Sequence, residues 1–394
     1  MLKTNLLIKT QTFFYLILTA IWSIQFHTLM AAKGVPHATA LQMMAFMQLT
    51  VIASMYLYSK LNERIVNRQR FLRLSLILRL VMCIVLFFVP SNIYQFLFLF
   101  YIIMGTGHDM TWESGVIEYT GKNNLDFGKF RMFGSLGFTA SGFIVSALLV
   151  VLPDPSFLLL FAAGLNALLL LLNLNTKLEK NVAKVNDNKK AKLPLPIHAI
   201  LLLSALVMVM PNSFGFLLNG HFQSNFDMNL QQATLWASIA VLMGSCISEV
   251  AALLSADKLI AKYSARKMIA IGFMCSIARW SLAFLAPNAI TFAATYLFHG
   301  FTFAFIYLGL ISIMKQIFGE ARAGKIAVRM FFYANISSVI MAQLYTLLLD
   351  SIGVRGFFGL FIILSVLLLI AYIGLVKAPI FNAQYQEDEL LEVE

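Results

Sequence analysis

The chain has 394 residues, of which 60% are apolar and 12% are charged, and its formal net charge is +11. Soluble globular proteins carry about 25% charged and about 45–50% apolar residues, so this composition excludes a water-soluble protein. The apolar runs are unbroken and about 20 residues long, which is the length of a spanning helix and about twice that of a membrane β-strand. The predicted fold class is therefore an all-α membrane protein without a sizeable aqueous domain.

Twelve apolar runs follow one another along the chain, separated by polar breaks, and each is predicted to be a transmembrane helix. The first is interpreted as a span rather than a removed signal peptide, because it continues without a small-residue cleavage site. Pro90-Ser91-Asn92 alone separates the third span from the fourth. The predicted spans are 11–32, 38–58, 71–90, 93–120, 129–152, 156–173, 196–218, 231–254, 268–286, 290–313, 327–349 and 357–377.

A long polar stretch rich in Lys and Asn divides these twelve helices into two six-helix halves. The predicted parts are an N-terminal half over 1–175, a central cytoplasmic loop over 176–195, a C-terminal half over 196–380 and an acidic cytoplasmic tail over 381–394. Basic residues fill alternate breaks, whereas the opposite breaks hold only Lys33 and Arg355. Because positive charge near span ends stays in the cytoplasm, both termini are predicted to be cytoplasmic in a cell membrane, expected to be a bacterial inner membrane. The net charge is then a topology signal that requires no nucleic-acid partner.

Charged side chains inside the spans are the candidate functional residues, because each costs at least about 2.5–3.5 kcal/mol at the bilayer centre. They are Arg79, His108, Asp109, Glu113, Glu118, Arg131, Glu249, Arg279 and His299.

The fourth and fifth spans are predicted to bring an acid and an arginine together. Glu113 lies nine residues before Lys122 and Arg131 nine residues after it, so the two reach the same depth on antiparallel helices. Asp109 precedes Glu113 by four residues and shares its helix face. Whichever acid lacks the arginine is the better proton carrier, and Trp112 is a candidate to stack on a bound ring. The alternative is a salt bridge that only holds two helices in register.

The second half shows a comparable arrangement. Arg279 and His299 lie ten residues on either side of position 289, and Glu249 comes from the preceding helix. These three residues are predicted to form either a proton-coupling cluster or an interhelical polar clamp. Arg79 is interpreted as structural.

Motifs for other chemistry are absent from the sequence. The three cysteines share no metal or disulfide spacing. The chain has no GxxxxGK[ST] loop, no HExxH and no GxSxG, so ATP-driven transport within this chain is excluded and no enzyme activity, cofactor or metal is predicted.

The stretch from Asp126 to Gly137, DFGKFRMFGSLG, closely resembles the G-[KR]-x-R-[MLV]-[FW]-G-[SC] signature of the lactose permease and phenylpropionate permease group of the major facilitator superfamily. Glu113 occupies the position of the acid eighteen residues upstream. In the second half, Glu249-Val250, Arg279-Trp280 and Phe298-His299-Gly300 look most like the phenylpropionate permease branch. The resemblance implies the two-half fold of that superfamily, with the substrate bound at the midplane.

The resemblance also implies roles for individual residues. Glu113 and Arg131 would bind the substrate, and Glu249, Arg279 and His299 would couple it to protons. Lactose permeases carry a protonating carboxylate three residues after the histidine, where this chain has Thr302, so Asp109, Glu249 or His299 must carry the proton and a sugar is less favoured. The family's loop motif is degenerate after the second span, but its second-half counterpart keeps Asp257 and a basic end, and Asp257 is interpreted as a gate contact at a helix end.

The predicted function is therefore proton-coupled symport of a small organic solute, which is an aromatic acid, a nucleoside or a sugar, by alternating access. The expected partners are the solute, protons and the lipid bilayer, and a monomer is expected to suffice. A multidrug/proton antiporter of the same fold is the alternative, which the buried arginines disfavour because they repel cationic drugs. A non-transporting receptor on a transporter fold is a third hypothesis, and it predicts dispensable buried charges.

Overall fold

The computed structural model describes residues 2–62, 67–123, 125–152, 154–176, 193–215, 217–318, 326 and 329–381. Within these ranges the secondary structure is helical, with no strand. Eight helices of this described part are long and apolar enough to span a membrane, and two shorter apolar helices accompany them. The all-helical fold class is confirmed.

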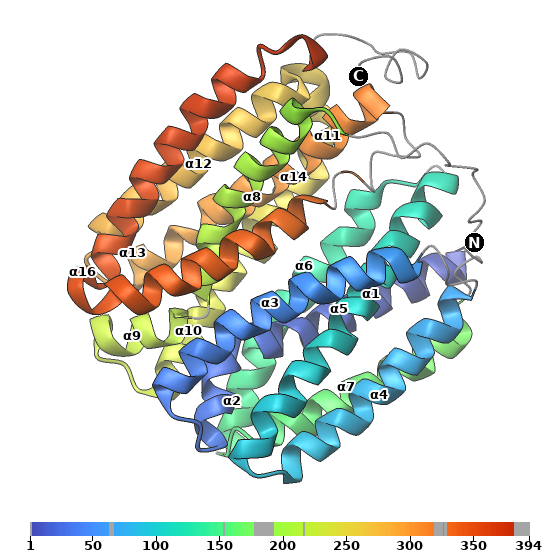
Figure 1. Cartoon of the computed structure of the whole chain (residues 1–394), viewed down its shortest axis with the longest axis vertical. Coiled ribbons are helices and arrows are strands. Elements are labelled where there is room, and N and C mark those ends of the chain that lie inside the picture. Colours follow the sequence, from blue (N-terminus) through green and yellow to red (C-terminus); the bar gives the residue numbers. More distant parts are fainter. Residues whose placement is uncertain are drawn as a thin grey trace.

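Five of the six predicted spans of the first half agree with the observed helices to within about four residues (Figure 1). The first, predicted over 11–32, instead begins at Leu2 and is interrupted at Gln25. The break at Pro90 is confirmed, because α4 ends at Phe88 and Pro90 is the N-cap residue of α5. Side-chain caps also begin helices where the sequence turns polar: Asn67 accepts a hydrogen bond from the Arg70 N–H, and Asp126 accepts one from the Gly128 N–H. The helices are α1 (Leu2–Ile24), α2 (Phe26–Ala32), α3 (His37–Asn62), α4 (Arg68–Phe88), α5 (Ser91–Lys122), α6 (Phe127–Val151) and α7 (Phe157–Asn175).

The second half is less regular than the sequence predicts. The span predicted over 231–254 contains a π-helix, η1, between two α-helices, and a short helix precedes the long helix of the span predicted over 290–313. The elements are α8 (Leu195–Gly215), α9 (Leu218–Phe226), α10 (Leu230–Val241), η1 (Leu242–Glu249), α11 (Val250–Tyr263), α12 (Ala265–Leu285), α13 (Ala289–Ala294), α14 (Tyr296–Phe318), α16 (Arg329–Leu375) and the 3₁₀ turn η2 (Pro379–Phe381).

The last two predicted spans both lie in α16, which turns back on itself in Figure 1. Gly353 interrupts it with φ 64°, a left-handed conformation that glycine adopts without the steric cost of a Cβ atom. The chain reverses there with very few loop residues.

The described helices pack around two large apolar cores and a small third cluster of Ala252, Leu253, Met268, Ala304 and Phe305. One core runs from Ile8 to Leu169 and the other from Ile197 to Phe381. In the first group α1 packs on α6 and α4 on α7, and in the second α12 packs on α14 and α8 on α16. The two groups lie side by side in Figure 1 and meet where α6 packs on α10, η1 and α11, and where α3 packs on α16. A substrate held between the groups would therefore lie beside these helices.

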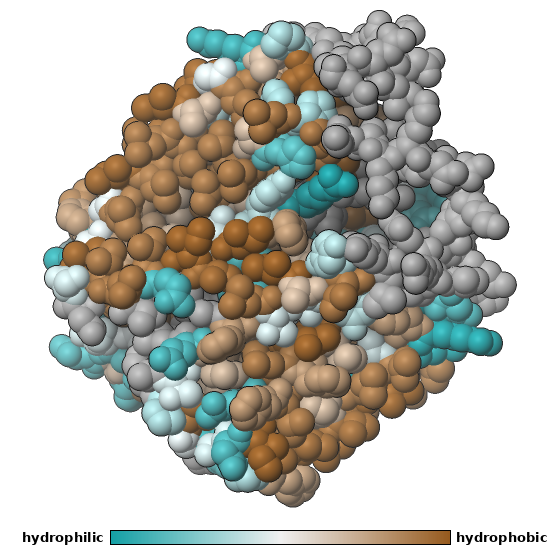
Figure 2. All heavy atoms as spheres, viewed as in Figure 1, coloured by the Kyte–Doolittle hydropathy of each residue, from teal (hydrophilic) through white to brown (hydrophobic). Residues whose placement is uncertain are grey.

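Large apolar side chains also cover the outside of the bundle. Phe88, Phe96 and Leu285 are among many that are exposed, and Figure 2 shows apolar residues along the flanks of α12, α16 and α4. Such broad exposed apolar surface would be costly in water and suits contact with lipid. The protein is a multi-pass membrane protein.

Candidate functional site

Polar contacts cross between the two helical groups beside α5 and α6. These helices carry Glu113, Arg131 and Ser135, and the opposite group contributes Glu249 from η1 and Tyr307 from α14. This set of five residues is called the interface site below.

Glu113 contacts the opposite group through a tyrosine. The Tyr307 hydroxyl donates a hydrogen bond to Glu113 Oε1 over 3.3 Å. The predicted ion pair with Arg131 is not formed: neither of the two ion pairs among the described residues includes either side chain. Equal depth on antiparallel helices brings Glu113 and Arg131 near the same side chain, Tyr307, and both act on it electrostatically. The two residues nevertheless do not pair with each other.

Arg131 lies against an aromatic ring of the opposite group. Its guanidinium carbon is 5.6 Å from the centroid of the Phe303 ring. Its Nη1 is buried and has no hydrogen-bond partner among the described residues. The guanidinium also attracts Glu249 electrostatically. Arg131 therefore keeps an unsatisfied donor at the interface, which a ligand acceptor can take.

Glu249 bonds across the interface and not to the arginine and histidine of its own half. It is buried, and Ser135 donates a hydrogen bond to its Oε1 over 2.6 Å. The predicted approach of Glu249 to Arg279 is replaced by this contact and by the attraction of Arg131. Glu249 is the last residue of the π-helix η1, whose altered winding changes where its end residues point.

A glycine allows η1 to pack tightly on α14. A Cβ atom at Gly300 would lie 2.1 Å from Ser248 Oγ and 2.2 Å from the Gly244 carbonyl oxygen. Only a residue without a side chain fits, so the position of Glu249 depends on this close helix contact.

Arg279 and His299 stay together, as predicted, inside the second core. Arg279 is buried, with its guanidinium carbon 4.3 Å from the Tyr296 ring centroid and 4.5 Å from that of Trp280. It acts electrostatically on His299, whose Nδ1 has no partner among the described residues. This pair packs on η1, because the His299 ring lies beside Gly244.

The remaining predicted residues take other positions. Asp109 interacts electrostatically with Glu113, and its buried Oδ1 has no partner in the described part of the chain. Trp112 belongs to the first apolar core. Asp257 lies on α11, and its side chain is outside the described residues. The Thr302 hydroxyl donates to the Phe298 carbonyl of its own helix over 2.8 Å.

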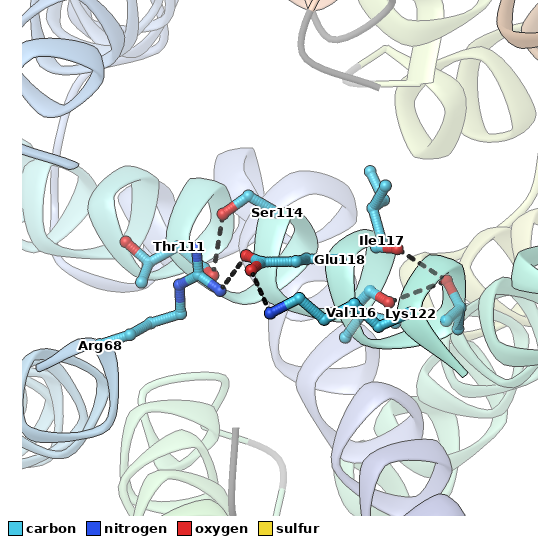
Figure 3. Close-up of polar contacts among 8 residues, drawn as sticks. Arg68, Thr111, Ser114, Val116, Ile117, Glu118 and Lys122 are labelled. Carbon is cyan, nitrogen blue, oxygen red and sulfur yellow. Dashed lines mark hydrogen bonds and ion pairs between the residues drawn. The ribbon is translucent and has the colours of Figure 1, made fainter. Parts of the chain in front are cut away.

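Glu118 forms an ion-pair cluster at the end of α5 (Figure 3). Its carboxylate lies 3.0 Å from Arg68 Nη1 and 3.1 Å from Lys122 Nζ. These contacts satisfy the carboxylate at the helix end, away from the interface site.

Sequence reasoning missed Ser135, Tyr307 and Phe303. Ser135 follows Arg131 by four residues, so it shares a helix face with that arginine, and Phe303 precedes Tyr307 by the same interval. This spacing was the available signal, but neutral residues at a helical interval from a charge are common in apolar spans.

The sequence model of the MFS_1 like family matches residues 7–333, which is most of the chain. The chain belongs to this family. It is a transporter of the major facilitator type, as the resemblance in its fifth span indicates. No curated protein matches the sequence.

Solved structures of transporters share the fold. The nucleoside transporter NupG is 16% identical, with a TM-score of 0.66, over 95% of this chain and 99% of that one. A D-xylose-proton symporter is 15% identical, with a TM-score of 0.70, over 95% and 96% of the two chains. A POT family transporter in complex with a thioalcohol conjugated peptide is 14% identical, with a TM-score of 0.74, over 96% of each chain. At these identities the likeness establishes the fold.

Proposed function

We propose that this transporter couples the movement of a small organic solute to protons by alternating access. The observation that carries the proposal is that two carboxylates, half-buried Glu113 and buried Glu249, each accept a hydrogen bond from the other half: Glu113 from Tyr307, and Glu249 from Ser135. When the halves separate, these contacts break, so a solute or a proton that replaces them changes the balance between conformations. The halves proposed to move are 1–175 and 196–380, with both termini in the cytoplasm.

The solute is proposed to bind at Glu113, Arg131 and Tyr307. Arg131 has a donor without a partner among the described residues. Glu113 is an acceptor, and the hydrogen bond that it now accepts from Tyr307 is long, at 3.3 Å. Phe303 stacks on Tyr307 with 5.6 Å between ring centroids. Donor, acceptor and aromatic surface together suit a planar solute with a polar or carboxylate group, such as an aromatic acid or a nucleoside. The nucleoside transporter among the structural neighbours is consistent with this class.

Glu249 is proposed to carry the coupled proton. A buried carboxylate that loses the Ser135 hydroxyl and the Arg131 charge when the halves part would bind a proton more readily in that conformation. Arg279 and His299 are proposed to hold η1, and thus Glu249, in place. Asp109 is a second buried acid available for proton binding.

Uptake into proteoliposomes tests coupling. Candidate solutes are first selected by thermal shift of the purified protein, and a radiolabelled one is then offered with an imposed pH gradient. We expect uphill accumulation that a protonophore abolishes. Accumulation that does not depend on the pH gradient would contradict proton coupling. Solute movement in the direction opposite to the protons would favour the multidrug/proton antiporter, provided that Asp109→Asn abolishes this movement.

A matched pair of tyrosine variants tests the binding site. Tyr307→Phe removes the hydroxyl but keeps the ring. If the hydroxyl bonds to the solute once the solute has replaced its contact with Glu113, losing that bond of about 0.5–1.5 kcal/mol should raise the solute dissociation constant by about twofold to tenfold. Tyr372→Phe removes a hydroxyl that donates to the Arg266 carbonyl within the second half, and should leave the constant unchanged. Equal effects in calorimetry would place the solute elsewhere.

A further inference from the structure

A second buried arginine lies in the core of the first half, away from the interface site. Arg79, in the middle of α4, is 2% exposed. Its Nη2 donates a hydrogen bond to the Tyr101 hydroxyl over 3.0 Å, whereas its Nε and Nη1 have no partner among the described residues. The two ion pairs of this described part both involve Glu118, and neither reaches Arg79.

Other unsatisfied donors gather around this guanidinium. The Tyr15 hydroxyl and the Trp22 indole Nε1 are buried without a partner among the described residues. The Tyr15 ring centroid lies 5.8 Å from the Arg79 guanidinium carbon, and the Trp22 ring lies 4.3 Å from that of Tyr101. Three neighbouring side chains of this core, Arg79, Tyr15 and Trp22, therefore carry buried donors without a partner among the described residues.

His108 and Ser75, which lie beside this cluster, carry no negative charge, and no described acid forms an ion pair with Arg79. His108 Nδ1 shares a 2.8 Å hydrogen bond with Ser75 Oγ, and its ring lies 5.1 Å from that of Tyr15. A guanidinium stays protonated, and an unpaired buried charge costs several kcal/mol, of which a desolvated cation–π contact returns about 2 kcal/mol. The charge balance of this cluster requires an anion.

Gly105 leaves part of the Arg79 guanidinium uncovered by side-chain atoms of α5. Gly105 on α5 faces Arg79, and a Cβ atom there would find only Arg79 atoms within 4 Å, the nearer being Cζ at 3.8 Å. We propose that a small monovalent anion binds at Arg79 in the core between α1, α4 and α5, held by the guanidinium and by the Tyr15 and Trp22 donors. Its source is either a halide in solution or the carboxylate of a solute.

Anion-dependent thermal unfolding of the purified full chain tests the site. Chloride or bromide is titrated against gluconate at constant ionic strength with no solute present, and benzoate is titrated in a second arm. We expect a saturable rise in Tm with a halide, with benzoate or with both, because an anion that binds the folded state stabilises it. A rise in Tm with the halide alone identifies a halide from solution as the bound anion, and a rise with benzoate alone identifies the carboxylate of a solute. No saturable rise in either arm overturns the proposal.

Three variants separate this site from a general salt effect. Arg79→Met should abolish the rise, whereas Arg70→Gln, at an exposed position on the same helix, should keep it. Gly105→Ala places a methyl group against the guanidinium while adding a better helix former, so its Tm without anion should equal or exceed the wild-type value while the anion-dependent rise shrinks. If Arg79→Met fails to fold, the anion-dependent rise in Tm of Gly105→Ala tests the proposal instead. An unchanged rise in Gly105→Ala, or in folded Arg79→Met, overturns the proposal.

Discussion

Among the described residues, Ser135 and Glu249 form the shortest hydrogen bond between the two halves, and Ser135→Ala should weaken the closed interface. The bond is 2.6 Å long, and its two side chains are 2% and 6% exposed. A hydrogen bond to a charged group contributes about 1.5–3 kcal/mol. Because the bond exists only while α6 touches η1, its loss should shift the equilibrium toward separated halves by about 10-fold to 150-fold.

Distance measurements between spin labels check this prediction. Labels at Lys129 on α6 and Lys258 on α11 sit at exposed positions of two helices that pack together, in a background without the native cysteines. Ser135→Ala should broaden the distance distribution toward longer values. Ser255→Ala is the matched control, because its hydroxyl donates to the Ala251 carbonyl within α11 and does not cross the interface. Identical distributions for the wild type and Ser135→Ala would refute the reasoning.

Three further substitutions test the interface site and its support. Arg131→Lys keeps the charge but loses the planar donor fork and much of its contact with Phe303, so solute affinity should fall at least about tenfold in calorimetry while the protein stays folded. Glu249→Gln keeps an oxygen that accepts from Ser135, so binding and exchange should persist while uphill accumulation is lost; loss of binding would show that Glu249 also holds solute. Gly300→Ala should lower the unfolding free energy by about 1–3 kcal/mol or more, because the added Cβ overlaps Ser248 and Gly244. Gly374→Ala, with open space around the added Cβ, should stabilise its helix by about 0.5–1 kcal/mol, and a similar loss in both variants would contradict the packing argument.

Helix positions were predictable because a lipid environment makes them a local property. With no water to satisfy backbone groups, an apolar run must bond within its own segment, so apolar runs predict where helices form. The break at Pro90 and the reversal near Gly353 follow from local backbone chemistry. The π-helix η1 was not predicted, and it packs closely on Gly300 of α14, a contact between segments about 50 residues apart that hydropathy does not encode.

The sequence by itself determined which charged residues lie inside the spans, and the tertiary structure decided which of them meet. Glu113, Arg131, Glu249 and Arg279 stand out in any apolar span, since burying a charge is costly wherever it occurs. Matching depths along two helices leaves the rotation of each helix about its axis open, and one residue changes that direction by about 100°. Rotation and the π-helix place Glu113 against Tyr307 and Glu249 against Ser135, so the pairs that join the halves depend on the packing of helices far apart in the sequence.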